Sequence, residues 1–443
     1  MKIQISDHFS FPKLIIFTLP TIAMLVFTSL YSIVDGFFVS NYVGEPAFAA
    51  INLVFPFIMI LGVIGFMFGT GGSALVAKTL GENQPAKANS YFSMIVYSAL
   101  ILAVAISILG WFLINPVLQK FGADGELLIN SVIYGKLLIL SLPAFILQFM
   151  FQTLFITAGK PTLGLCVTLI AGFTNMFLDY IFIGKMHFGL QGAAYATIIG
   201  QFIGGILPIL YFAKPNSSLL RLTKTNFDFK ILLKTCINGS SEMVTQISMS
   251  LINMLYMWQL LRLTGQSGVA AFGVIMYLEF IFSGIFLGYS TGSSPIISYN
   301  YGAGNSNELK NLFKKSLIIL IILQTTLTAI AEIFAYPLSG IFVGYSSSLH
   351  EMTTYGFRLY SLAFLIMGFN IFGSAFYTAL NNGVISAIIS FSRTCVFQVL
   401  CILILPAFFG INGIWSAIGI SEILTLAITG SFLYRTKSVY GYV

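Results

Sequence analysis

The chain has 443 residues, of which 57% are hydrophobic and only 8% are charged, and its formal net charge is +7. A typical soluble domain has about 25% charged residues, so this composition excludes a soluble globular protein. Apolar runs of about 20 residues, each long enough to cross a bilayer as a helix, recur along the whole chain. We therefore predict an all-α polytopic membrane protein.

Taken in chain order, the apolar runs predict twelve transmembrane helices, and the first run is too long for a cleavable signal peptide. The longest polar connection separates the sixth helix from the seventh. The predicted ranges are 14–39, 49–77, 91–114, 131–157, 163–183, 190–212, 235–261, 269–297, 314–336, 354–380, 384–408 and 411–433.

The distribution of basic residues predicts the orientation. With twelve spans both termini lie on one side, and fifteen Lys and Arg residues between Lys2 and Lys437 fall on that side, against five on the other. Arg393 alone falls within a predicted span. The positive-inside rule then places both termini in the cytoplasm of a multi-pass protein of the cell membrane. Because the membrane topology explains the excess of basic residues, we expect no nucleic-acid partner.

The two halves of the chain align without a gap when the sequence is shifted by 221 residues. Each half has an even number of spans, so both halves enter the membrane in the same direction, as in transporters built from parallel repeats. We predict two pseudo-symmetric six-helix lobes, residues 1–218 and 219–443, with a substrate site between them. Aligned pairs include Gly44 with Gly265, Gly71 with Gly292, and Gly81 with Gly302.

Polar residues gather at one depth of the first lobe. Asp179 lies inside the fifth span, where a carboxylate costs about 2.5–3.5 kcal/mol and usually marks a functional site. Asn175 stands four residues earlier, on the same face of the helix. The directions of the spans place Asp35 and Thr197 at the same outer depth. Two neighbouring carboxylates cannot both ionise cheaply there, which predicts a proton-binding site, and the same oxygens also suit Na⁺.

The alternative for these residues is a hydrogen-bonded clamp between helices. At the positions shifted by 221 residues the carboxylates are replaced by Tyr256 and Leu400, so the predicted ion site belongs to the first lobe only. Pro20, fifteen residues before Asp35, lacks an amide donor and predicts a kink in the first span. We expect ion binding at Asp35 and Asp179 to shift this bend.

Candidate substrate contacts lie in the second lobe. Glu279 in the eighth span and Glu242 in the seventh would attract a cationic substrate, although Glu242 could instead pair with Arg393. Tyr256 and Met257 are further candidates, because polarisable Met side chains suit promiscuous binding, but such residues often face lipid.

Several classes of function are excluded by missing motifs. The sequence has no GxxxxGK[ST] or HExxH pattern, so we expect neither an enzyme nor a built-in ATPase. Its three His residues fall in predicted ends or loops, and its four Cys lack metal-ligand spacing, so no metal or cofactor is expected. An ion gradient is the expected energy source, unless a separate subunit supplies ATP.

Four segments, LPTIAMLVFTSLYSIVDGFFVSNYVG, TNMFLDYIFI, GLQGAAYATIIGQ and SSPIISYNYGAGN, resemble the MATE (multidrug and toxic compound extrusion) family, closest to its bacterial MepA-type and DinF-type branches. The resemblance covers essentially the whole chain. It implies a two-lobed antiporter that exports cationic amphipathic drugs in exchange for protons or sodium. The family's ion site falls on Asp35, Asn175, Asp179 and Thr197 and its helix kink on Pro20.

The alternative within the same superfamily is a flippase for lipid-linked oligosaccharides. Such flippases tend to line their cavity with basic residues, whereas the charges inside the predicted spans here are acidic apart from Arg393. We expect the protein to function as a monomer in the lipid bilayer.

Overall fold

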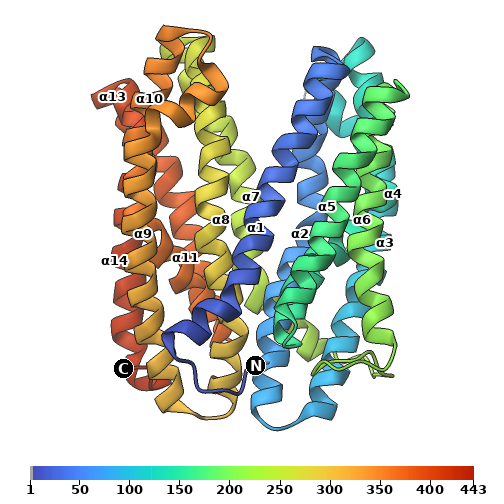
Figure 1. Ribbon diagram of the computed structural model, residues 1–443, viewed down its shortest axis with the longest axis vertical. Coiled ribbons are helices and arrows are strands. Elements are labelled where there is room, and N and C mark those ends of the chain that lie inside the picture. The colour runs from blue at the N-terminus through green and yellow to red at the C-terminus, as the bar shows by residue number, and fades with distance from the viewer. Residues whose placement is uncertain (1–2, 121) are drawn as a thin grey trace.

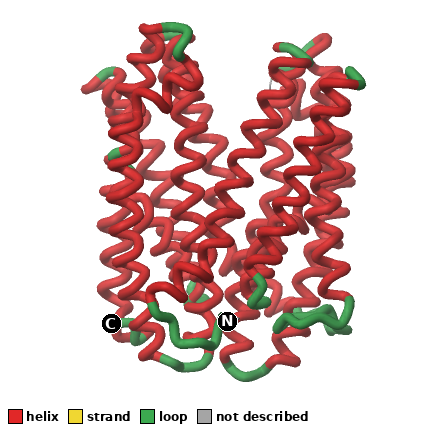
Figure 2. The backbone as a smooth tube through the Cα atoms, viewed as in Figure 1, coloured by secondary structure: helices red, strands yellow, loops and turns green. Residues whose placement is uncertain are grey.

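The computed structural model describes residues 3–120 and 122–443, so Lys2 lies outside the described residues. These residues form a bundle of helices whose short connections gather at its two ends (Figure 2). Ten helices are long and apolar enough to cross a membrane, or eleven if one bent pair counts as a single span. The protein is a multi-pass helical membrane protein.

The first half of the chain forms the N-terminal group of helices: α1 (Phe11–Tyr42), α2 (Glu45–Gly81), α3 (Pro85–Lys120), α4 (Gly125–Thr157), α5 (Pro161–Asp179) with η1 (Tyr180–Lys185), and α6 (Gly189–Ala213). The second half forms the C-terminal group: α7 (Phe229–Thr264), α8 (Gln266–Gly302), α9 (Ser306–Val343), α10 (Ser347–Ser361), α11 (Phe364–Ala379), α12 (Gly383–Phe391) with η2 (Ser392–Gln398) and α13 (Val399–Phe409), and α14 (Ile411–Tyr440). Figure 1 shows the two groups side by side, with both termini at the same end.

The helices contain the predicted ranges except for residues 362–363 and Leu380 of the tenth, but three features depart from straight spans. The fifth and eleventh ranges each contain a π-helical segment, η1 and η2. The tenth range is divided into α10 and α11, which are bent by 48°. Although α7 has 36 residues, it is not among the ten apolar helices because polar side chains recur along it.

Apolar packing joins the two groups near the termini. One buried core takes side chains from both groups, for example Phe68 of α2 and Tyr289 of α8. Two further cores are each confined to one group, one around Tyr134 of α4 and the other around Trp415 of α14. The groups accordingly diverge toward the end opposite the termini (Figure 1).

Glycines allow α2 and α8 to pack backbone against backbone at the shared end. A Cβ atom on Gly81 would overlap the carbonyl oxygen of Tyr299, and one on Gly302 would overlap that of Lys78. The two contacts are reciprocal, and both the glycines and the carbonyl residues are related by the 221-residue shift seen in the sequence. Glycine is therefore needed at both positions for this close approach.

A second aligned pair of glycines repeats this arrangement on the flanking helices. Gly71 of α2 lies against the backbone of α7 at Thr235 and Gly239. Gly292 of α8 lies against α1 at Thr18 and Thr21, with Cβ contacts that would measure 3.2–3.3 Å. Each central helix thus packs against the first helix of the opposite group.

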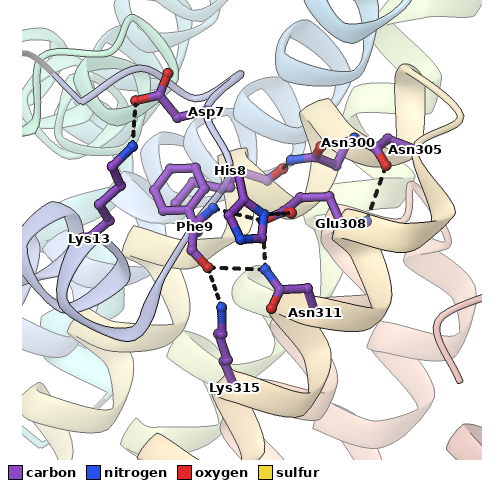
Figure 3. Close-up of polar contacts among 10 residues, drawn as sticks. Asp7, His8, Phe9, Lys13, Asn300, Asn305, Glu308, Asn311 and Lys315 are labelled. Carbon is purple, nitrogen blue, oxygen red and sulfur yellow. Dashed lines mark hydrogen bonds and ion pairs between the residues drawn. The ribbon is translucent and has the colours of Figure 1, made fainter.

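Residues 3–10, which we call the N-terminal strap, cross from α1 to the C-terminal group (Figure 3). The backbone N–H of Phe9 donates to Glu308 Oε1 at 2.9 Å, and His8 lies beside the other oxygen of the same carboxylate. The carbonyl of Phe9 accepts from Lys315 Nζ at 2.6 Å and from Asn311 Nδ2 at 3.0 Å. The start of α1 is therefore fastened to the first turns of α9.

Candidate ion site and central cavity

Asp179 is the last residue of α5, where the α-helix passes into the π-helical segment η1. Its side chain is fully buried, and no donor among the described residues reaches either carboxylate oxygen. Asn175, one turn earlier, is 4% exposed, and its Oδ1 also lacks a donor. Two polar side chains on one helix face thus present unsatisfied oxygen atoms inside the N-terminal group, where an unpaired polar group is costly.

Packing of α1 on α5 brings Asp35 to the level of Asp179. Gly172 of α5 lies against the rings of Phe27 and Tyr31, so the next turn of α1, which carries Asp35, stands beside the end of α5. The carboxyl groups of Asp35 and Asp179 lie within hydrogen-bonding reach of each other. Because both are acceptors when ionised, a shared proton or a bound cation is required to join them.

Thr197 stands at the same level on α6. That helix runs antiparallel to α5, with Gly200 against Asn175 and Gly192 against Phe182. Thr197 falls between these two contacts, but no hydrogen bond joins its hydroxyl to either carboxyl group within the described part of the chain. The structure therefore brings the two carboxylates and Asn175 together directly and places Thr197 next to them.

Tyr134 of α4 is a residue of this site that the sequence reasoning missed. It is buried, and it lies near enough to Asp35 and Asp179 to interact electrostatically with both. In the sequence it stands out only as part of an aligned Tyr-Gly pair in the repeat. Its position near the start of α4 gave no sign that it faces α1 and α5.

The chemistry of the site is that of oxygen ligands. The described side chains around Asp35 and Asp179 contribute carboxylate, amide and hydroxyl oxygens, which suit a proton or a hard cation such as Na⁺. In the described ranges no three His, Cys, Asp or Glu side chains gather into a metal site. Pro20 lies inside α1, which continues through it as one helix toward Asp35.

A second polar region, which we call the central cavity, lies between the two groups and is lined by α2, α4, α7, α8, α11, α12 and η2. Its charged lining residues are Glu242 of α7 and Arg393 of η2, and Asn370 of α11 adds an amide. Hydroxyl groups supply much of the rest, from Thr70, Ser73, Thr153, Ser241, Thr245, Ser290, Thr291, Ser294, Ser374, Thr378 and Ser390.

Arg393 is held by α14 and not by Glu242. Its Nε donates to Glu422 Oε1 at 2.7 Å, and the Glu422 side chain is only 2% exposed. Asn370 donates to the other oxygen of Glu422 at 2.7 Å, and Thr429 donates to Asn370 Oδ1 at 3.0 Å. The side chains of Glu422, Asn370 and Thr429 are buried, and the Arg393 side chain is 17% exposed.

The four candidate substrate contacts lie in different surroundings. Glu242 lines the central cavity, whereas Glu279 of α8 is buried outside it and interacts electrostatically with Arg393. Tyr256 is 1% exposed and stacks on Phe272 with ring centroids 4.5 Å apart. Met257, the next residue of α7, is 47% exposed. The structure brings only Glu242 to the central cavity.

Comparison with known proteins places this geometry in a family. The MatE family model matches the chain twice, over residues 20–181 and 243–404. A relative named multidrug export protein MepA, from Staphylococcus haemolyticus, is 23% identical over 430 residues, which cover 97% of this chain and 94% of the relative.

Two solved structures have the same fold. One, described as MATE in complex with MaL6, has a TM-score of 0.93 at 22% identity, and the match covers 98% of both chains. The other, described as the outward-facing conformation of a multidrug resistance MATE family transporter, has a TM-score of 0.92 at 22% identity over 98% of both chains. The family model is matched over most of the chain, and its members are transporters and not enzymes. The chain belongs to the MatE family.

Proposed function

We propose that this protein is a secondary active antiporter that exports cationic amphipathic compounds from the cell in exchange for H⁺ or Na⁺. The observation that carries the proposal is the Asp35–Asp179 pair, in which Asp35 Oδ1 and both carboxyl oxygens of the fully buried Asp179 lack a hydrogen-bond partner within the described part of the chain. A single coupling ion satisfies these oxygens when bound, and its release leaves two carboxylates in repulsion. The name of the related multidrug export protein supports drugs as the exported class.

The coupling ion acts by stabilising one arrangement of α1 against α5 over another. A ligand shifts a conformational equilibrium only by its difference in affinity for the two states. Asp35 and Asp179 stand on two different helices, so an ion that bridges them favours the arrangement in which α1 and α5 are in contact. In this proposal Pro20 gives α1 the freedom to bend when the ion is released.

The proposed orientation places both termini in the cytoplasm, so the helix groups diverge toward the outside. We propose twelve spans in two lobes, residues 1–218 and 219–443. The count adds the bent pair α10–α11 and the more polar helix α7 to the ten apolar helices. The reciprocal glycine contacts at Gly81 and Gly302 support two pseudo-symmetric lobes. A single chain contains both lobes and the cavity between them, which supports a functional monomer.

Glu242 is the proposed first contact for a cationic substrate, because it lines the central cavity. Glu279 adds negative charge behind it, beside Arg393. Tyr256 supports the wall near Glu279, and Met257 contributes exposed apolar surface on the same helix. A lipid-linked precursor flippase is the alternative, but among the described residues the central cavity is lined by one cationic side chain, Arg393, which is paired with Glu422, and by the carboxylate of Glu242.

The test is transport by the purified protein in liposomes. A cationic dye is loaded and its efflux is followed under a proton gradient alone and then under a sodium gradient alone. Efflux driven by one of the two gradients supports the antiporter. Scrambling of a labelled lipid, with no gradient-driven dye movement, would instead favour the flippase.

A further inference from the structure

A second depression, which we call the lateral groove, lies on the seam between the two helix groups. It is lined by α7 between residues 236 and 244, by α12 and η2 between residues 384 and 392, and by Met67 of α2. Its volume is 580 Å³, within the range of about 300–1,000 Å³ that is typical of ligand pockets. Val384 and Phe391 in its wall are 60% and 50% exposed, so the groove opens outward.

One helix separates the lateral groove from the central cavity. On α7, Glu242 and Thr245 line the cavity, whereas Ile237, Ser240 and Val244 line the groove. None of the described residues that line the groove is charged. The hydroxyl of Ser240 donates to the carbonyl of Ile237 at 2.7 Å and needs no further partner. The lining therefore suits a hydrocarbon chain and offers little to a polar solute.

The groove has the length of one leaflet of a bilayer. Ten residues separate Lys234 from Val244, which is a rise of about 15 Å along α7. The hydrocarbon core of a bilayer is about 30 Å thick, so this rise covers half of it. Both α7 and α12 begin at the end of the bundle that carries the termini, where Asn382 donates to Tyr440 at 2.7 Å. The groove thus runs from that membrane surface toward the bilayer centre.

Two lysines stand where the groove meets the membrane surface. Lys230 lies seven residues before Ile237 and fourteen before Val244, so the three share one face of α7. Lys234 lies three residues before Ile237. Both lysines are exposed, and neither forms an ion pair among the described residues. The carboxylate of Asp228 accepts instead from two backbone N–H groups of the first turn of α7.

We propose that the lateral groove binds one acyl chain of an anionic phospholipid, whose phosphate is held by Lys230 and Lys234. Each basic side chain near an anionic lipid surface strengthens binding about fivefold, whereas the cation of a zwitterionic headgroup opposes the lysines. A chain in the groove contacts both helix groups, because Met67 belongs to one and α7 to the other. It therefore favours the arrangement in which the groups touch at this end. The inference does not depend on the proposed antiport.

The test compares two lipids that have the same chains and different headgroups. Native mass spectrometry of the purified protein measures the dissociation constant of the first bound palmitoyl-oleoyl phosphatidylglycerol and of the matching phosphatidylcholine. One variant, Lys230→Gln with Lys234→Gln, removes the charges, and another, Ala387→Phe, fills the groove from α12. The matched controls are Lys310→Gln and Ala105→Phe, at exposed positions of α9 and α3.

We expect the wild type to bind phosphatidylglycerol about tenfold or more tightly than phosphatidylcholine, because two lysines contribute. The double lysine variant should weaken phosphatidylglycerol alone and reduce this preference to about threefold or less. Ala387→Phe should weaken both lipids severalfold and keep the preference, since it blocks the chain and not the headgroup. Both controls should behave as the wild type does.

Three results would overturn the inference. An unchanged preference in the double lysine variant would show that these lysines do not hold the phosphate. An equal loss in Lys310→Gln would show that only the overall surface charge matters. Unchanged lipid binding in Ala387→Phe would show that the chain lies elsewhere. The two variants test separate parts of the site, so either one decides the question if the other does not fold.

Discussion

The carboxylate of Glu308 accepts the backbone N–H of Phe9 at 2.9 Å, across the boundary between the two helix groups. Phe9 directly precedes α1, the helix that carries Asp35, and Glu308 belongs to the first turn of α9 (Figure 3). The same carboxylate also accepts from Asn311 at 2.9 Å. One buried side chain therefore connects the start of the proposed ion-site helix to the opposite group.

Replacing this carboxylate should loosen the strap. Glu308→Ala removes the acceptor of Phe9 and leaves a buried N–H unsatisfied, at a cost of about 1–3 kcal/mol in the free energy of unfolding. Thermal unfolding of the purified protein in detergent measures the loss. Glu351→Ala, at an exposed position of α10, is the matched control and should leave the melting temperature unchanged. Equal melting temperatures for the two variants would show that the strap adds no stability.

The ion-site proposal predicts a specific loss of coupling. Asp179→Asn keeps the size of the side chain but removes its charge and its ability to take up a proton. Gradient-driven dye efflux should fall to the level of liposomes without protein, while expression and melting temperature are kept. Asp124→Asn, at the exposed N-terminal end of α4, is the control and should transport normally. Full drug resistance in cells that express the Asp179 variant would contradict the assignment.

The close contact of α2 and α8 predicts an effect of a single methyl group. In Gly302→Ala the Cβ would overlap the carbonyl oxygen of Lys78, and such overpacking costs about 1–3 kcal/mol. The melting temperature measures this cost. Gly430→Ala makes the same change in α14, where nothing lies within 4 Å of the new Cβ, and should be neutral or slightly stabilising. A neutral Gly302→Ala would mean that the two helices separate easily.

The role proposed for Pro20 affects the rate of transport and not the stability of the folded protein. Pro20→Ala restores a backbone donor and stiffens α1, so dye exchange should slow severalfold while dye binding is unchanged. Counterflow in liposomes measures the exchange, and equilibrium binding in detergent measures the affinity. Pro116→Ala in α3, an exposed proline inside a helix, is the control. Unchanged exchange at normal expression would remove the idea of a proline hinge.

Sequence reasoning could place Asp35, Asn175 and Asp179 together because helical spacing and span direction depend only on local sequence. The same spacing could have separated Tyr256 from Met257, since successive residues of a helix point about 100° apart and cannot share one face. The structure indeed buries the first and exposes the second.

Other features depend on contacts between distant helices and could not be read from one sequence. Arg393 pairs with Glu422 because η2 packs against α14, and no local pattern selects Glu422 over Glu242. The same holds for Tyr134, which reaches the carboxylates only through the packing of α4. The π-helical segments and the break after Ser361 likewise interrupt runs whose apolar pattern is continuous, so the pattern alone could not predict them.

The N-terminal strap also decides what an attached probe would report. Both backbone groups of Phe9 are bound to α9, so a spectroscopic label on the strap, for instance at the exposed Gln4, would follow the C-terminal group. Its distance to a second label on α5 would then track the separation of the two groups during a transport cycle. A label on α1 near Phe27 and Tyr31, where the helix packs on Gly172 of α5, would instead follow the N-terminal group.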